Sequence, residues 1–251
     1  MDIVLIGTGN TANVLGKKLK AAGHEIVQIF GRDAAAASEL AYEIDTESTN
    51  YWSVVNRNAD LYILAVSDIS IEEVMRELNL PEKTIVHTAG AVSKEVLKGA
   101  YHFGVFYPLQ SLKKGSGYLP ETPILIDAND QETLQELIQV AESISDTVVT
   151  ADDEQRLKMH LAAVFCNNFV NHIYTLMEEF CRKEGLDFRL LIPLIEETTN
   201  RIKTMQPSDA QTGPAIRKDA STIEKHMALL HEYPSLKLLY QTMTQSIQQH
   251  V

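Results

Sequence analysis

Short apolar runs alternate with amphipathic stretches from the first residue to about residue 150. The strand-like runs cover residues 2–7, 24–31, 59–67, 83–90, 101–109, 122–128 and 146–150. Apolar strands that alternate with helices are typical of a parallel sheet that is buried on both faces. Because crossover connections are right-handed, we expect an α/β fold with a doubly wound, mostly parallel sheet of the Rossmann type.

After residue 150 the pattern is helical throughout. No Gly or Pro interrupts residues 152–184, acidic residues open the stretch and Gly185 follows it, so one long helix is predicted there. Its apolar residues cover more than one stripe, which indicates a helix buried between neighbours. Further helices are expected over 188–204, 221–230 and 234–249. We therefore predict a Rossmann-like dinucleotide-binding domain over 1–150 and a helical substrate and dimerisation domain over 151–251.

The amino-acid composition limits the classes of partner that we expect this protein to bind. The formal net charge of −12 argues against nucleic acid and against an anionic membrane surface, because both attract surplus Lys and Arg. No apolar run reaches the length of a membrane span, and the chain opens directly on a strand, so we expect neither a membrane segment nor a signal peptide. The two cysteines lie in one helical pattern and are expected to be reduced thiols in a cytoplasmic protein.

The first strand leads into the motif G-x-G-x-x-A, formed by Gly7-Thr8-Gly9-Asn10-Thr11-Ala12. In a dinucleotide-binding unit the first glycine permits the tight turn and the second lets the backbone approach the pyrophosphate. The small third residue lets the helix pack close to the strand, and the helix N-terminus binds the phosphates. A strand, turn and helix with two glycines and no cofactor is the alternative; the second strand that follows favours the cofactor.

The end of the second strand bears on the choice between NADP and NAD. A carboxylate there would bind the adenosine ribose and repel a 2′-phosphate, but this chain has Gly31 and then Arg32. Gly31 would leave room and Arg32 would offer a charged fork to the phosphate, which predicts NADP. Two alternatives stay open: Arg32 pairs with Asp33 at the surface, or Asp33 reaches the ribose.

Longer stretches carry a family resemblance. Residues 6–19 with "GRD" and "ADLYILAVSD" resemble the N-terminal domain of pyrroline-5-carboxylate reductases and deazaflavin-dependent NADP oxidoreductases. "FYPLQSL", "HLAAVFCNNFVNH" and "TGPAIRKDASTIEKH" are similar to an uncharacterised bacterial family that joins such a domain to a helical domain of unknown function. The resemblance implies an NADP oxidoreductase. That family is expected to have His before the Pro of the first of these segments, where this chain has Tyr107, so Tyr107 would take its place.

The resemblance also implies a site at the carboxyl ends of the strands, beside the helical domain. Val66 and Ser67 would flank the ribose and nicotinamide there, with His87, Thr88 and Tyr107 at neighbouring strand ends. His87 has an alternative role as a buried histidine bonded to a loop.

A polar stripe marks the long helical stretch. At about 100° per residue, His160, Asn167 and Asn171 share one face, with Asn168 beside them. Such groups are poor for helix propensity and costly to bury unpaired, so we expect this face to bind substrate, with His160 or Tyr107 supplying a proton and Asn168 assisting. Bonds to neighbouring loops, or a dimer seam, are the alternatives.

Two further cations complete the candidate site residues. Arg217 and Lys218 follow the rigid Gly213-Pro214 pair and could bind a carboxylate or phosphate of a substrate, or could be solvated charges at a helix start. No H-E-x-x-H, CxxC or His/Cys cluster has metal-ligand spacing, so no metal is expected.

The sequence therefore favours an NADP(H)-dependent oxidoreductase that transfers hydride to or from a small carbonyl or imine substrate, and that dimerises through its helical half. The alternative is a dinucleotide-binding sensor or regulatory protein that uses the same cleft without turnover.

Overall fold

The computed structural model describes residues 1–115 and 118–250. Contacts between residues divide the chain into two compact units, Met1–Asn168 and Phe169–Val251. The first unit includes the helix that begins at Asp153, whose Arg156 is buried.

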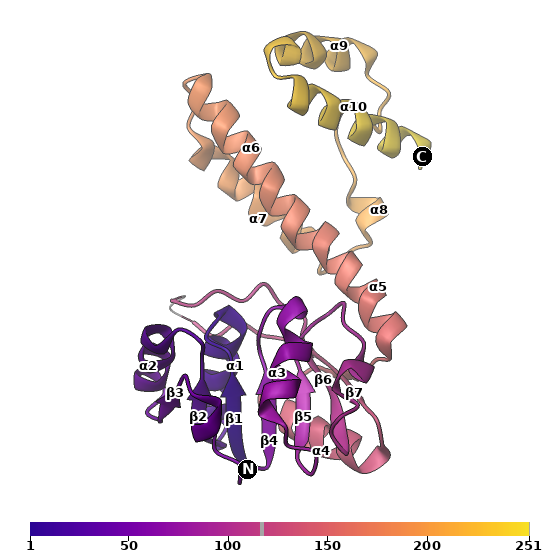
Figure 1. The fold of residues 1–251 in the computed structure, drawn as a ribbon. Helices are drawn as coiled ribbons and strands as arrows, with labels where there is room; N and C mark the ends of the chain where they lie inside the picture. The colour runs from indigo at the N-terminus through magenta and orange to yellow at the C-terminus, as the bar shows by residue number, and fades with distance from the viewer. Residues whose placement is uncertain (116–117, 251) are drawn as a thin grey trace. The chain divides into compact units, whose positions relative to one another are not determined.

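The first unit is a doubly wound α/β domain, as predicted, with one eight-stranded sheet in the order β3-β2-β1-β4-β5-β6-β7-β8. The strands are β1 Asp2–Ile6, β2 Glu25–Phe30, β3 Ser48–Thr49, β4 Leu61–Leu64, β5 Thr84–His87, β6 His102–Pro108, β7 Ile124–Ala128 and β8 Val148–Thr150. The helices are α1 Asn10–Ala21, α2 Ala34–Glu43, α3 Ile71–Leu78, α4 Gln131–Glu142 and α5 Asp153–Ala163, with 3-10 turns η1 Trp52–Val54, η2 Asp68–Ser70 and η3 Lys94–Leu97. Figure 1 shows α1, α2, α3 and α4 beside the strands of this sheet.

All neighbouring strands of this sheet are parallel except β6 and β7, which run antiparallel. The sheet has a hydrophobic core on each face, and alternate residues of β1 point into one or the other. Ile3 and Leu5 pack with α1, α2 and α4, whereas Val4 and Ile6 pack with α3 and the 3-10 turns. Both faces are therefore buried, which explains the unbroken apolar runs in the sequence. The chain order reverses between β1 and β4, the switch point at which α/β sheets bind ligands.

The second unit is helical, as predicted. Its elements are α6 Val170–Lys183, η5 Phe188–Leu191, α7 Ile192–Arg201, α8 Pro207–Ala210, α9 Ala220–Leu229, η6 Leu230–Glu232 and α10 Pro234–Gln249. The predicted single helix over 152–184 is interrupted: between α5 and α6 the residues Val164–Phe169 form a π-helix, η4. The sequence does not reveal this interruption, because residues 164–169 contain no Gly or Pro that would mark a break in the helix.

Candidate functional site

The turn between β1 and α1 depends on Gly7. Its φ of +133° is rarely adopted by residues with a side chain, and a Cβ there would lie 2.2 Å from the carbonyl oxygen of Ala65. Gly9 is the N-cap of α1, and a Cβ on it would meet no atom within 4 Å. Among the described residues no side chain caps the helix, and its first turn holds no acidic residue, so its first N–H groups are not engaged by a side-chain cap. This arrangement suits an anion.

A cavity of about 370 Å³ opens beside this turn, at the carboxyl ends of β1, β2 and β4. Its lining includes seven of the predicted cofactor residues, namely Gly7, Thr8, Gly9, Gly31, Arg32, Val66 and Ser67. It also includes Phe30, Asp33, Trp52, Ser70 and Glu73. The cavity therefore lies at the switch point of the sheet.

Residues 31–33 form one wall of this cavity. Arg32 is exposed, and the carboxylate of Asp33 accepts hydrogen bonds from the N–H groups of Ala35 and Ala36 at 2.9 and 3.2 Å, which caps α2. Oδ1 of Asp33 is therefore engaged at the start of its own helix. Gly31 also packs closely against Thr8, because a Cβ there would lie 2.5 Å from the methyl carbon of Thr8.

The sequence prediction missed Trp52, the one tryptophan of the chain. It belongs to η1 and stacks on Phe30 with ring centroids 3.7 Å apart and an interplanar angle of 22°. Both rings line the cavity. The aromatic wall is formed by a connection between strands, and no motif in the sequence marks it.

Other predicted cofactor residues lie outside the lining of this cavity. Ala12 is buried against the sheet, as expected for a helix that packs closely, and Thr11 follows Asn10 in the first turn of α1. The side chain of Asn10 accepts a hydrogen bond from the N–H of Lys114 at 3.1 Å. Thr88 donates through its hydroxyl to the carbonyl of Leu64 at 3.3 Å.

His87 is fully buried and bonded within its own loop. Its Nδ1 accepts from the N–H of Ala89 at 3.2 Å, and its Nε2 lies 3.4 Å from the carbonyl oxygen of Ser93. Burial, and then the positive charge of Arg156, lower the pKa of His87 to about 4. His87 is thus a neutral loop histidine, the alternative considered from the sequence, and we leave it out of the proposed cofactor residues.

We expect His87 to make folding pH-dependent. The unfolded imidazole binds a proton below its ordinary pKa of about 6.5, while the folded one stays neutral down to about pH 4. Stability from this group is therefore complete above pH 6.5 and is lost as the pH falls toward 4, with about 2 kcal/mol lost between pH 8 and 5. Denaturant unfolding at pH 8 and pH 5 measures this change in the free energy of unfolding. His87→Asn keeps a hydrogen-bond acceptor but does not titrate, so its free energy of unfolding should lack this pH-dependent contribution. An equal pH dependence in both proteins would contradict the expectation.

Tyr107, near the carboxyl end of β6, meets His160 of α5. Their Oη and Nδ1 atoms are 2.9 Å apart, and the rings contact edge to face. Gly90 packs against both, since a Cβ there would lie 2.7 Å from His160 Nδ1 and 2.9 Å from Tyr107 Cζ. Burial raises the pKa of the Tyr107 hydroxyl. The structure thus brings together the two residues that the sequence offered separately as proton donors.

The remaining predicted residues are spread over both units. Asn167 and Asn168 are exposed at the end of the first unit, and Asn171 is exposed in the second. The π-helix changes the rotation per residue between His160 and Asn171, so the stripe predicted for a continuous α-helix does not apply. Arg217 and Lys218 are exposed in the turn before α9, where Lys218 has a left-handed φ of 52°.

Within residues 1–115 and 118–250, no group of three or more His, Cys, Asp and Glu side chains is arranged to hold a metal ion. In the same part of the chain, none of the helices combines the length and apolar character that crossing a membrane requires.

Comparison with protein families matches both halves of the chain. Residues 2–90 match the family of NADP oxidoreductases described as coenzyme F420-dependent. Residues 122–247 match a domain of unknown function, DUF2520. No curated protein matches the chain.

Solved structures resemble the chain over nearly its whole length. A Bacteroides fragilis protein, provisionally described as an NADP oxidoreductase, is 39% identical with a TM-score of 0.92, and the match covers 99% of this chain and 98% of that one. A pyrroline-5-carboxylate reductase from Streptococcus pyogenes is 14% identical, with a TM-score of 0.68 and coverage of 99% and 98%. A reductive aminase from Aspergillus terreus is 16% identical, with a TM-score of 0.70 and coverage of 98% and 94%. The pyrroline-5-carboxylate reductase and the reductive aminase share the fold of this chain. The Bacteroides fragilis protein and the match over residues 122–247 show more: the chain belongs to the family that joins a Rossmann-like NADP oxidoreductase domain to a DUF2520 domain.

Proposed function

We propose that this protein is an NADP(H)-dependent oxidoreductase that transfers hydride between its cofactor and a small carbonyl or imine substrate. The observation that carries the proposal is the Tyr107–His160 pair at the same edge of the sheet as the glycine-turn cavity. The strand register aligns four residues across β1, β4, β5 and β6, namely Ile6, Leu64, His87 and Val105. Gly7, Val66 and Tyr107 each follow one of these aligned residues by one or two positions, so all three lie at the same edge of the sheet. Tyr107 is two strands from Val66, about 10 Å sideways.

Several features of the cavity support NADP(H) as the cofactor. The uncapped start of α1 would bind the pyrophosphate beside Gly7 and Gly9. Arg32 is free of the Asp33 carboxylate that caps α2, and it would bind the 2′-phosphate. Trp52 and Phe30 supply an aromatic wall. The structure of the Aspergillus terreus reductive aminase, which contains NADPH, supports this choice of cofactor.

The chain would supply the proton. When bound, the nicotinamide supplies or accepts the hydride. Because burial raises the pKa of Tyr107, its hydroxyl keeps its proton at neutral pH and can donate to a carbonyl oxygen or an imine nitrogen. His160 Nδ1, 2.9 Å away, can return a proton to the tyrosine oxygen. We propose that Asn167, Asn168, Asn171, Arg217 and Lys218 contribute to substrate binding.

The proposed function is tested by a panel of ketones, ketoacids and imines with NADPH, followed by the absorbance of the reduced nicotinamide. Binding is measured separately through the fluorescence of Trp52, which is the only tryptophan and lines the cavity. Turnover of a carbonyl or imine supports the enzyme. Tight NADPH binding without turnover of any panel member would favour the sensor, and no binding would overturn both.

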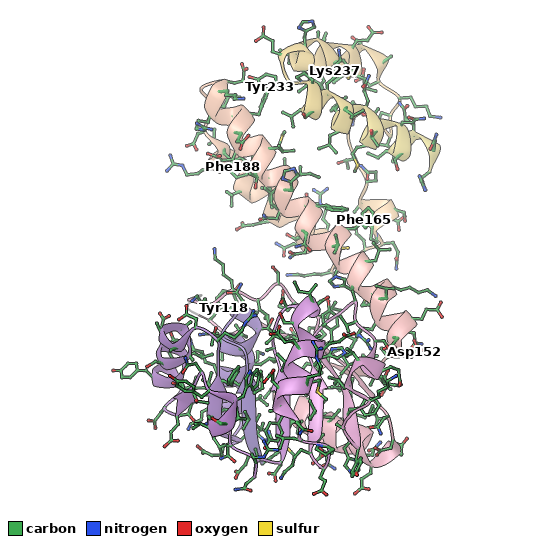
Figure 2. The ribbon with its side chains drawn as sticks, viewed as in Figure 1. Tyr118, Asp152, Phe165, Phe188, Tyr233 and Lys237 are labelled. Carbon is green, nitrogen blue, oxygen red and sulfur yellow. The ribbon has the colours of Figure 1, made fainter. Side chains whose placement is uncertain are left out.

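We also propose that the second unit forms a homodimer. Among its described residues, the buried hydrophobic ones are only Cys181, Ala215 and Leu236. Large apolar side chains are instead exposed, among them Leu190 at 78%, Leu229 at 69% and Leu238 at 66%. The unit also holds an apolar cavity of about 480 Å³ between residues of α6, α9 and α10. Figure 2 shows the side chains of this unit, with Phe188 and Tyr233 labelled. So much exposed apolar surface is typical of an interface.

Light scattering should give twice the monomer mass at micromolar concentration. Leu190→Glu should shift the equilibrium toward monomer, because a charge at the centre of an apolar interface is costly. Glu196→Gln, at an exposed polar position of α7, is the matched control and should stay dimeric. A monomeric wild-type protein at that concentration would contradict the proposal.

A further inference from the structure

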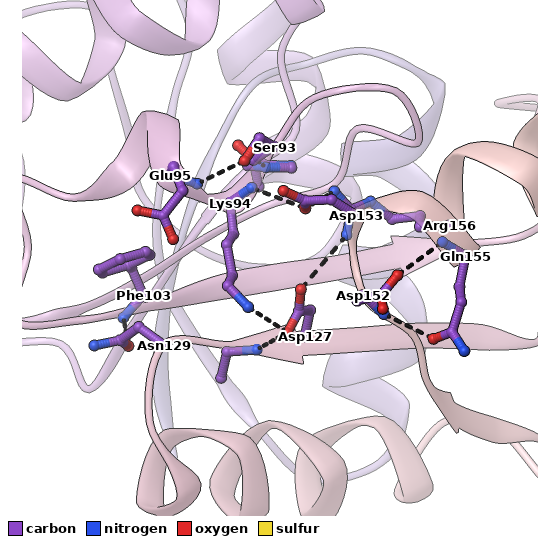
Figure 3. Close-up of polar contacts among 12 residues, drawn as sticks. Ser93, Lys94, Glu95, Phe103, Asp127, Asn129, Asp152, Asp153, Gln155 and Arg156 are labelled. Atoms are coloured by element: carbon purple, nitrogen blue, oxygen red, sulfur yellow. Dashed lines mark hydrogen bonds and ion pairs between the residues drawn. The ribbon is translucent and has the colours of Figure 1, made fainter.

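A buried charged cluster lies at the start of α5 and is not part of the site described above. Arg156 is 1% exposed and Asp127 of β7 is 7% exposed. Lys94 donates from Nζ to Asp127 Oδ1 at 2.8 Å, and Asp153 accepts from the N–H of Lys94 at 3.2 Å (Figure 3). Three elements, η3, β7 and α5, therefore meet in this cluster. Charges taken from water in this way are costly, so their retention calls for an explanation.

Arg156 joins the helix that carries His160 to the loop that packs against the Tyr107–His160 pair. Its Nη2 donates to Asp153 Oδ1 at 2.6 Å and to the carbonyl of Val92, in the loop formed by residues 88–93. Arg156 lies one helical turn before His160 on α5, so both side chains project from the same face of that helix. One guanidinium thus holds the helix that carries His160 and the loop that carries Gly90.

That loop decides whether the pair can form. Gly90 lies so close to His160 Nδ1 and Tyr107 Cζ that even a methyl group there would clash with both. A shift of the loop toward the rings would push them apart, and a shift of α5 away would break the 2.9 Å contact. The bond between hydroxyl and imidazole therefore depends on the spacing that Arg156 fixes.

Stability alone does not account for this arginine. Among the described residues, its Nε and Nη1 and Oδ2 of Asp127 have no hydrogen-bond partner, and Nη1 and Oδ2 lie 4.0 Å apart. Apolar residues of similar volume are often as stabilising as an incompletely paired buried ion pair. The charge also reaches the site: burial raises the pKa of Tyr107, Arg156 acts in the opposite direction, and Asp68 raises that pKa further.

We propose that Arg156 is a positioning residue that sets α5 and the 88–93 loop so that Tyr107 and His160 meet at hydrogen-bond distance. This inference rests on the proposed function for the use of the pair, but the geometry can be tested without turnover. The competing explanation is that Arg156 only anchors the start of α5.

The first measurement is the nitrogen chemical shift of His160 Nδ1 by NMR at one fixed pH in the protein without cofactor, with the signal assigned through His160→Gln. Tyr107→Phe should change this chemical shift, because it removes the hydroxyl bonded to Nδ1. Arg156→Met should change it as well, and the Tyr107→Phe, Arg156→Met double variant should change it no further than Tyr107→Phe alone. Lys158→Met, at an exposed position that forms an ion pair with Glu154 on the same helix, is the control and should leave it unchanged.

The second measurement is the split between kcat and KM. We expect Arg156→Met to lower kcat about 10- to 100-fold, because small displacements of reacting groups have effects of that size, and to leave KM and NADPH binding within about twofold. Arg156→Lys keeps the positive charge but not the planar guanidinium, so its kcat should lie between those of the wild type and Arg156→Met. It also serves if Arg156→Met fails to fold.

The outcomes separate the two claims. A His160 Nδ1 chemical shift that Arg156→Lys and Arg156→Met leave as in the wild type, or changes that add fully to that of Tyr107→Phe, would overturn the positioning role whether or not the protein turns over. A coupled change of this chemical shift with no turnover of any panel substrate would keep the positioning role and reject the proposed function.

Discussion

Replacing Tyr107 with Phe is expected to lower kcat for reduction of a carbonyl or imine by about 10²- to 10⁴-fold, the usual contribution of a positioned acid. The substitution removes one oxygen from a side chain that is 9% exposed and packs on Val105 and Leu125. The ring that fills this space remains. We therefore expect NADPH binding, followed by Trp52 fluorescence, to change little, so that the loss appears in kcat.

Tyr101→Phe provides the matched control, because Tyr101 precedes the same strand and is 66% exposed. Its turnover should equal that of the wild type. His160→Gln should reduce kcat as well, and the double variant should lose less than the product of the two single effects, because the two groups act as one unit. An unchanged kcat in Tyr107→Phe would remove this tyrosine from the reaction, and a fully additive double variant would show that the two residues act independently.

The cofactor half of the site is largely readable from sequence because its residues are local. Gly7, Gly9 and Arg32 stand at fixed distances along one strand–turn–helix–strand unit, and the backbone geometry of that unit dictates where they meet. The structure places all three around one cavity, together with Val66 and Ser67. Binding of NADP there stays a prediction. What the motif could not supply is the capping role of Asp33, which depends on where α2 begins.

The proton-donor half depends on contacts between distant residues, and sequence pattern is a poor guide to these. Tyr107 of β6 and His160 of α5 are far apart in the sequence, and Arg156, a residue type that is mostly exposed in proteins, is instead buried where α5 meets the 88–93 loop. The predicted stripe of asparagines rested on a uniform 100° per residue, which the π-helix Val164–Phe169 does not follow. Residues 164–169 contain no Gly or Pro that would mark this interruption in the sequence.

Replacing Arg32 with Ala is expected to weaken NADPH binding by about 1.5–3 kcal/mol, roughly a 10- to 150-fold rise in Kd, and to leave NADH nearly unchanged. The reason is that NADH lacks the 2′-phosphate to which the guanidinium would donate. Asp33 does not offset the loss, because Oδ1 of its carboxylate accepts from Ala35 and Ala36 at the start of α2. The single tryptophan in the cavity again reports binding of both cofactors.

Salt dependence and a control variant isolate the charge effect. Arg32 is exposed, so raising ionic strength should weaken NADPH binding to the wild type more than to Arg32→Ala, in which the charge pair is absent. Arg32→Lys should retain part of the preference, since it keeps the charge but not the planar fork. Arg76→Ala, at an exposed position of α3 outside the cavity lining, should bind both cofactors as the wild type does. Equal affinities for NADPH and NADH in the wild type would contradict the role of Arg32 and leave the glycine turn as a site for either cofactor.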